Sequence, residues 1–220
     1  MERRTGSSAI VLRSKIVDMK GRATRLSCWF VVAAFVVALF APAISHAQTP
    51  TSESWIVPGR QYYFPVQPPA IARYANVHHD YPATDIFVPV GSVVVAVTNG
   101  VVDEVSRVDL WNPKTNDGAQ RGGLWVTIIG DDGVRYHTSH LSEVLPGIEA
   151  GVRVTAGQRI GLSGKTGNAI TTPAHVHFGI SRPTFAGDWK VRRGQVMPFV
   201  YLNAWKRGKD KKPVLPPGVK

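Results

Sequence analysis

One stretch decides the fold class: residues 85–102 read DIFVPVGSVVVAVTNGVV. Valine and isoleucine dominate it, and β-branched residues in short runs favour strands over helices. Pro89 and Gly91 interrupt the run, and Asn99-Gly100 near its end is typical of a tight hairpin turn. We therefore predict strands at 85–88 and 92–98, and a hairpin that leads into a further strand at 101–107.

Segments of the same kind continue along the chain, separated by turn-forming residues. Further strands are expected at 124–130, 134–140, 153–154, 159–163 and 175–181. Asp132-Gly133 predicts a hairpin between two of them, whereas residues 111–123 are expected to form a long loop. Helical periodicity beyond the first fifty residues is confined to Val196–Trp205. The sequence therefore predicts a mainly β protein with a single small antiparallel β domain.

Histidines are the residues most able to carry chemistry, and six of them follow residue 47. They form three clusters, which are His78-His79, His137 with His140, and His175 with His177. Alternate residues of a strand project to the same face, so His175 and His177 are expected to point the same way. Two imidazoles on one face suit a divalent metal such as zinc. A single histidine is as easily a surface or core residue, but three clusters together favour a site.

Asp85 begins an apolar strand, where a carboxylate is out of place without a partner. Two histidines and one aspartate would hold zinc and leave a fourth position open for water, which is the catalytic arrangement. The glycine-rich stretch 157–167 offers no competing site. A phosphate-binding loop needs glycine six positions before its lysine, and Arg159 stands there instead.

Four blocks of the sequence, in order, resemble the lysostaphin-like (LytM-type) zinc endopeptidases, and together they span roughly residues 78–181. They are the opening stretch 85–102, Ser139-His140-Leu141, the stretch 151–167, and His175-Val176-His177-Phe178. The resemblance implies a small antiparallel β domain with a groove across its sheet, related to duplicated-hybrid-motif barrels.

The resemblance also implies roles for individual residues. Carried over to this chain, the zinc ligands are His79, Asp85 and His177, and the two further histidines of the active site are His140 and His175. The chain departs from the family at one ligand, because the family usually has three residues between its first histidine and the aspartate, whereas five separate His79 from Asp85. The segment between them must bulge, and His78 is the alternative ligand.

The first 47 residues have the features of an export signal. Lys20, Arg22 and Arg25 precede an apolar run from Leu26 to Ala43, and small residues follow at 45 and 47. We expect residues 1–47 to be a signal peptide, with Met19 as an alternative start and an uncleaved membrane anchor as the alternative interpretation. The predicted organisation continues with a linker and N-terminal arm at 48–75, the peptidase domain at 76–205 and a basic tail at 206–220.

Composition limits the partners of an exported chain. Cys28 is the only cysteine and lies within the leader, so disulfides and cysteine-ligated metal sites are excluded from the remainder. Residues 1–47 hold seven Lys and Arg and two Asp and Glu, so that the net charge of +11 falls to about +6 without them. A basic surface outside the cell suits anionic cell-wall polymers, contacted through the tail. No basic stripe with interleaved aromatics indicates nucleic acid, and we expect a monomer that meets a membrane only if the leader is retained.

The family resemblance implies peptidoglycan as the substrate, cut in its stem peptide or its interpeptide bridge. Zinc-activated water would attack the amide, with His140 and His175 assisting. Two other functions stay open at this point. One is a catalytically silent module that binds wall peptides in the same groove, and the other is a zinc endopeptidase that acts on proteins. The expected location is the extracellular space, cell wall or periplasm.

Overall fold

The computed structural model describes residues 53–217. The predicted leader at 1–47 lies outside the described residues. Nine antiparallel strands make one sheet: β1 (Val66–Gln67), β2 (Thr84–Phe87), β3 (Val93–Val95), β4 (Gly100–Ser106), β5 (Leu124–Gly130), β6 (Arg135–Val144), β7 (Arg153–Val154), β8 (Arg159–Ser163) and β9 (His175–Ser181). The prediction of a mainly β, antiparallel domain is confirmed.

Among residues 53–217, two short α-helices and three 3-10 turns accompany the sheet. The helices are α1 (Trp189–Arg192) and α2 (Phe199–Lys206), of which the sequence predicted only the second. The turns are Pro69–Ile71, Gly118–Gln120 and Gly167–Thr171. In the part of the chain that the structure describes, no helix has the length and apolar character needed to cross a membrane.

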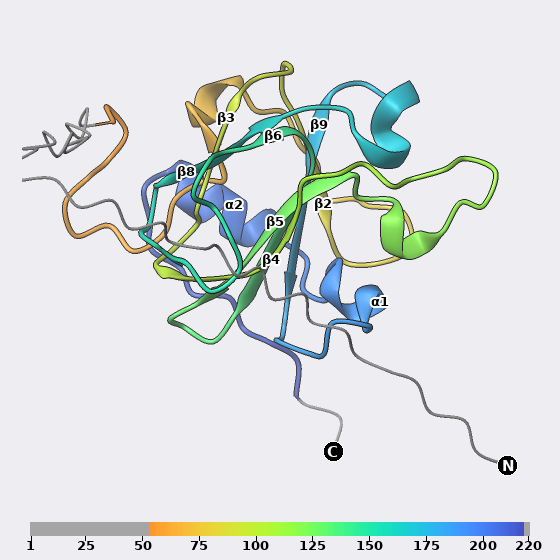
Figure 1. The fold of residues 1–220 in the computed structure, drawn as a ribbon. Helices are drawn as coiled ribbons and strands as arrows, with labels where there is room; N and C mark the ends of the chain where they lie inside the picture. The colour runs from red at the N-terminus through yellow and green to blue at the C-terminus, as the bar shows by residue number, and fades with distance from the viewer. Residues whose placement is uncertain (1–52, 218–220) are drawn as a thin grey trace, which may run out of the picture. The chain divides into compact units, whose positions relative to one another are not determined.

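The long strand β6 organises the sheet around the future site. One of its edges pairs with β5, while its other edge pairs with β9 over residues 135–139 and with β8 over residues 141–144. β9 in turn pairs with β2. The sheet therefore forks at β6, and the fork brings β2, β9 and the first half of β6 side by side (Figure 1).

The core lies against one face of the sheet. On β9, Val176, Phe178 and Ile180 are fully buried on this face, and the alternating positions point to the other face. Helix α2 covers the apolar face (Figure 1) and inserts Leu202 and Trp205. Burial of apolar surface on one side thus leaves the residues at 175 and 177 free to build a site on the other.

The N-terminal arm and the basic segment after α2 both pack on this domain. Tyr62 stacks on Trp205 with ring centroids 5.7 Å apart, and the backbone amide of Tyr63 donates to Val97. Asp210 accepts hydrogen bonds from the backbone amides of Gln61 and Tyr62. The arm and the first residues of the tail therefore hold each other in place.

One turn prediction is wrong. β3 and β4 flank Asn99-Gly100 but do not pair with each other, because β3 pairs with β1 and β8 while β4 pairs with β5 and β7. The Asn99 side chain accepts from the amide of Ala156, and its carbonyl accepts from Asp131. Contacts with residues distant in the sequence therefore determine the path of the chain from β3 to β4. The hairpin predicted at Asp132-Gly133 joins β5 to β6 as expected.

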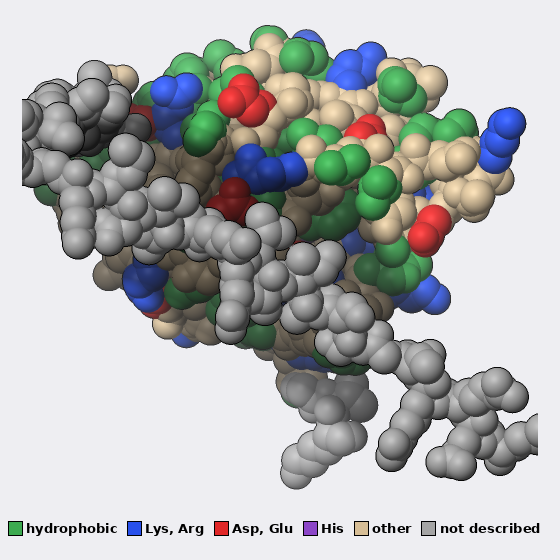
Figure 2. All heavy atoms as spheres, in the orientation of Figure 1, with side chains coloured by type: hydrophobic (Ala, Val, Ile, Leu, Met, Phe, Trp, Pro, Cys, Tyr) green, Lys and Arg blue, Asp and Glu red, His purple; other side chains and the backbone are tan. Residues whose placement is uncertain are grey.

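Charged side chains on the surface form no large field of one sign in the view of Figure 2. Lys and Arg side chains lie singly among Asp, Glu, apolar and polar ones on the described part of this face. The lysines at 209, 211 and 212 are exposed.

Candidate metal centre and active-site groove

The register of the sheet places an aspartate beside a histidine. Asp85 on β2 lies directly opposite His177 on β9, and His177 lies opposite Ser139 on β6. His175 lies two residues before His177 and faces the same way. This row across three strands lies in a pocket of about 540 Å³, into which His78 projects from the loop before β2.

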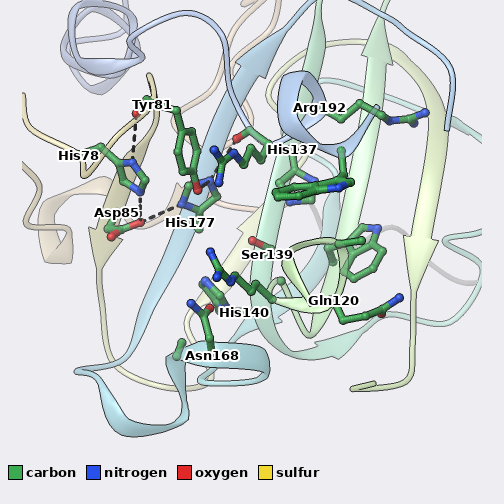
Figure 3. Close-up of a pocket in the computed structure, with 18 of the residues that line it drawn as sticks. His78, Tyr81, Asp85, Gln120, His137, Ser139, His140, Asn168, His177 and Arg192 are labelled. Carbon is green, nitrogen blue, oxygen red and sulfur yellow. Dashed lines mark hydrogen bonds and ion pairs between the residues drawn. The ribbon is translucent and has the colours of Figure 1, made fainter. Parts of the chain in front are cut away.

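Three residues bring metal-binding atoms together. One ligand atom each from His78, Asp85 and His177 lies within 4.8 Å of the others. His177 Nδ1 is 3.0 Å and His78 Nε2 is 3.6 Å from the same oxygen, Asp85 Oδ1 (Figure 3). A tetrahedral ion with bonds of about 2 Å separates its ligand atoms by about 3.3 Å. The three side chains therefore have the spacing of a zinc site.

Hydrogen bonds behind the two histidines fix which nitrogen faces the aspartate. His78 Nδ1 is 3.1 Å from the carbonyl oxygen of Tyr81, and His177 Nε2 is 3.1 Å from that of Arg193. Because a carbonyl can only accept, the nitrogen that faces it carries the proton. In the neutral rings, the lone pairs of His78 Nε2 and His177 Nδ1 then point toward a carboxylate oxygen. Such an arrangement of electron-pair donors fits a cation bound between them. Backbone hydrogen bonds of this kind orient the histidines that bind metals.

Two further histidines are held in the same manner. His140 Nδ1 and His175 Nδ1 each lie 2.8 Å from a backbone carbonyl, that of Thr166 and that of Pro173. Their Nε2 atoms are left as acceptors, and His175 Nε2 is 3.9 Å from Asp85 Oδ1. The rings of His140 and His175 are 4.9 Å apart. The structure thus brings both predicted histidines beside the group of His78, Asp85 and His177.

His140 reaches the site through a bulge in β6. Leu124 and Trp125 on β5 pair with Leu141 and Ser139, so His140 is the extra residue between them. Its φ of 62° is in the left-handed region, where a non-glycine residue is strained by about 1–3 kcal/mol. Strict alternation from Ser139 would turn residue 140 to the opposite face. The bulge re-aims it into the groove.

Burial sets the charge states of the site. Burial, with the nearby His177 and His175, lowers the pKa of His140 to about 3. Burial and the nearby His177 also lower the pKa of His78. Burial alone would raise the pKa of Asp85, but the contact with His177, together with nearby His175 and His78, lowers it to about 2. At neutral pH the site therefore offers one carboxylate and neutral His78 and His140, which is the protonation state that metal binding needs.

The structure does not bring His79, the ligand that the family resemblance implies, into the group of His78, Asp85 and His177. His79 is exposed, and its ring packs against that of His78 with centroids 5.0 Å apart. The segment between His79 and Asp85 is a run of bends, and the carbonyl of Tyr81 within it accepts from His78. His78 is thereby held toward Asp85, whereas the exposed His79 lines the pocket beside it.

Other residues of the groove were not assigned from the sequence. Tyr81 points into the pocket (Figure 3), with its hydroxyl 3.4 Å from His177 Nε2, and burial raises its pKa to about 12. Trp125 and Trp189 line the walls with Arg193. No common sequence pattern links them, because Trp125 lies near the start of β5, Trp189 begins α1 and Arg193 directly follows it. His137 also lines it, and burial and nearby Arg135 lower its pKa well below the usual value.

Comparison with known proteins agrees with this geometry. The sequence pattern of peptidase family M23 matches residues 79–195. The chain belongs to peptidase family M23. Glycyl-glycine endopeptidase ALE-1 of Staphylococcus capitis is 36% identical to this M23 chain over 105 residues, or 47% of the chain. The chain spans about a quarter, 25%, of that relative's length.

Solved structures show the same fold as this M23 domain. The antimicrobial peptidase lysostaphin from Staphylococcus simulans superposes with a TM-score of 0.50 at 25% identity, covering 71% of the chain and 59% of lysostaphin. A LytM-type protein from Ruminococcus gnavus superposes with a TM-score of 0.52 at 22% identity, covering 68% of the chain and 62% of that protein. The family resemblance and the fold class predicted from the sequence are confirmed.

Proposed function

We propose that this M23 protein is a zinc-dependent endopeptidase that cuts the stem peptides or peptide cross-links of bacterial peptidoglycan. The observation that carries the proposal is the convergence of four anchored histidines, each with one nitrogen left free, around Asp85 in one groove. Relatives named as peptidases and as a glycyl-glycine endopeptidase support the reaction class. Residues 1–47 would direct the chain out of the cell, where this substrate lies.

His78, Asp85 and His177 would hold the zinc ion, since their ligand atoms lie together and their backbone partners fix the orientation of both rings. His78 thus takes the place that the family resemblance gave to His79. When bound, the ion supplies Lewis-acid activation of water and of the scissile carbonyl. The protein's part is to present one carboxylate and two unprotonated imidazole nitrogens toward one point.

His140 and His175 would move the protons. Each keeps its Nδ1 proton on a backbone carbonyl, so that Nε2 is the atom that exchanges a proton. The two histidines orient the attacking water, accept its proton at Nε2 and return a proton to the leaving amine. Positioned acid–base groups of this kind contribute about 100-fold or more to a rate. His140→Ala or His175→Ala should therefore retain zinc and lose most turnover.

The test is release of new amino termini from purified peptidoglycan by residues 49–220, with and without added zinc. His177→Ala serves as the ligand control. Release that needs both zinc and His177 supports the proposal. Zinc binding by the wild type without release would favour a silent wall-binding module, and cleavage of unfolded protein substrates but not of wall would favour a general endopeptidase.

A further inference from the structure

Arg193 stands out in the groove because its guanidinium has no hydrogen-bond partner among the described residues. Its central carbon lies 3.6 Å from the ring centroid of Tyr81 and 5.1 Å from that of Trp189. Its Nε is buried without a partner, and 24% of the side chain is exposed. The nearest carboxylate is that of Asp80, which is 3.8 Å away, beyond hydrogen-bonding distance, and is 74% exposed. Two aromatic rings therefore hold a cation at the wall of the pocket with its donors unused.

Of the other arginines that line the pocket, Arg135 and Arg192 are paired with carboxylates, whereas Arg121 donates to the side chain of Asn116. Arg135 and Arg192 both contact Asp103 and Glu104, which gives a cluster of two cations and two anions. A cluster that is neutral within itself offers no net charge to a ligand. Arg193 lies outside the cluster and, with a divalent cation at the metal group, would make this side of the groove attractive to anions.

Arg193 is also close to where the reaction would take place. The backbone carbonyl of Arg193 accepts from His177 Nε2. The guanidinium of Arg193 stacks on the ring of Tyr81, whose hydroxyl lies 3.4 Å from the same nitrogen. A peptide residue spans roughly 3.5 Å when extended. A group bound by this guanidinium therefore belongs to a residue within roughly one or two positions of the scissile amide.

We propose that Arg193 binds a carboxylate of the substrate peptide, so that the groove selects acidic stem peptides over neutral glycine bridges. The planar guanidinium matches a carboxylate with two parallel hydrogen bonds, and stacking between rings pre-organises it for that contact. Neither ring can neutralise its charge. This inference rests on the proposed peptidase function and specifies which wall peptide that function takes.

The first experiment measures kcat/KM for zinc-loaded protein on three substrates. They are a cross-linked stem-peptide dimer with free carboxylates, the same dimer with its carboxylates as primary amides, and pentaglycine. A charge-assisted hydrogen bond predicts that the wild type prefers the free acid by roughly 10- to 100-fold. Arg193→Gln should lower the ratio of the rate on the acid to the rate on the amide to about one.

Two variants control for charge and geometry. Lys190→Gln removes a cation that lies 5.8 Å from the Trp189 ring but does not line the pocket, so it should keep the full preference. Arg193→Lys retains the charge without the planar fork and should keep only part of the preference. Equal rates on acid and amide by the wild type, or an unchanged ratio in Arg193→Gln, would overturn the inference.

A binding measurement separates this inference from the peptidase itself. Calorimetric titration of a stem tetrapeptide, as free acid and as amide, compares zinc-loaded wild type with Arg193→Gln. Any direct contact between the carboxylate and the metal is common to both proteins and cancels in the comparison. A tenfold or greater preference for the free acid that is present in the wild type and lost in Arg193→Gln supports the inference, even if no substrate is cut. Absence of cleavage would refute only the proposed reaction. A preference that is equal in both proteins refutes the role of Arg193.

Discussion

His78→Ala and His79→Ala, compared side by side, give the sharpest test of the metal centre. His78 Nε2 lies 3.6 Å from Asp85 Oδ1 and its ring is anchored on Tyr81, whereas His79 is exposed and outside the ligand group. We expect His78→Ala to lose most of its zinc affinity and His79→Ala to stay within about threefold of the wild type, since surface changes away from such features cost less than about 0.5 kcal/mol.

The expected loss follows from the number of ligands. Apparent zinc-binding free energies of structural sites are about 10–16 kcal/mol, and divided over their four protein ligands they give about 2.5–4 kcal/mol for each. At 1.36 kcal/mol for each factor of ten, losing one ligand weakens binding by roughly 100- to 1000-fold. A change that removes only the hydrogen bond between His78 Nδ1 and the Tyr81 carbonyl should weaken zinc binding less, by about 10- to 100-fold.

Zinc dissociation constants can be measured by competition with a chromophoric chelator at neutral pH. Circular dichroism of each variant checks that the sheet is intact. His177→Ala provides the reference for the loss of a full ligand. Equal losses in His78→Ala and His79→Ala, or a greater loss in His79→Ala, would refute the geometric assignment and restore the ligand that the family resemblance implies.

Three further changes test the surroundings of the site. Arg135→Ala removes one of the two buried cations that face Asp103 and Glu104 and leaves only Arg192 beside them, so it should destabilise the fold by about 3–5 kcal/mol in urea unfolding; a loss below about 1 kcal/mol would contradict this. Burial and the hydrogen bond to Asp132 raise the pKa of Tyr136, so its contribution to stability is complete below pH 10 and is lost as pH rises further. The wild type should lose up to about 1.4 kcal/mol per pH unit per tyrosine there, and Tyr136→Phe should show a shallower slope in the same titration. Gly167 has a φ of 66°, and in Gly167→Ala the new Cβ would clash with the carbonyl oxygen of Arg121. The neighbouring Thr166 carbonyl anchors His140, so turnover should fall at least tenfold while zinc affinity changes little. Turnover equal to that of the wild type would rule this out.

The sequence by itself determined the strands and the family. Runs of β-branched residues between glycines gave most strand positions, because burial on one face of a sheet imposes that composition over a few adjacent residues. The spacing of His175 and His177 placed both on one face, since alternation is a local property of a strand. The strand containing Asp85 was predicted on the same grounds, and the structure pairs it with His177.

Only the tertiary structure decided which residues meet at the site. The choice of His78 over His79 depends on how five residues bulge before β2, and a loop's path is set by packing and not by its own pattern. His140 enters the groove through a bulge that exists because β5 pairs with residues on either side of it. The wrong hairpin at Asn99-Gly100 has the same cause, because distant partners outweighed a local turn preference. Arg193 comes to the groove on the segment after β9, and only its position between two aromatic rings distinguishes it from any other arginine.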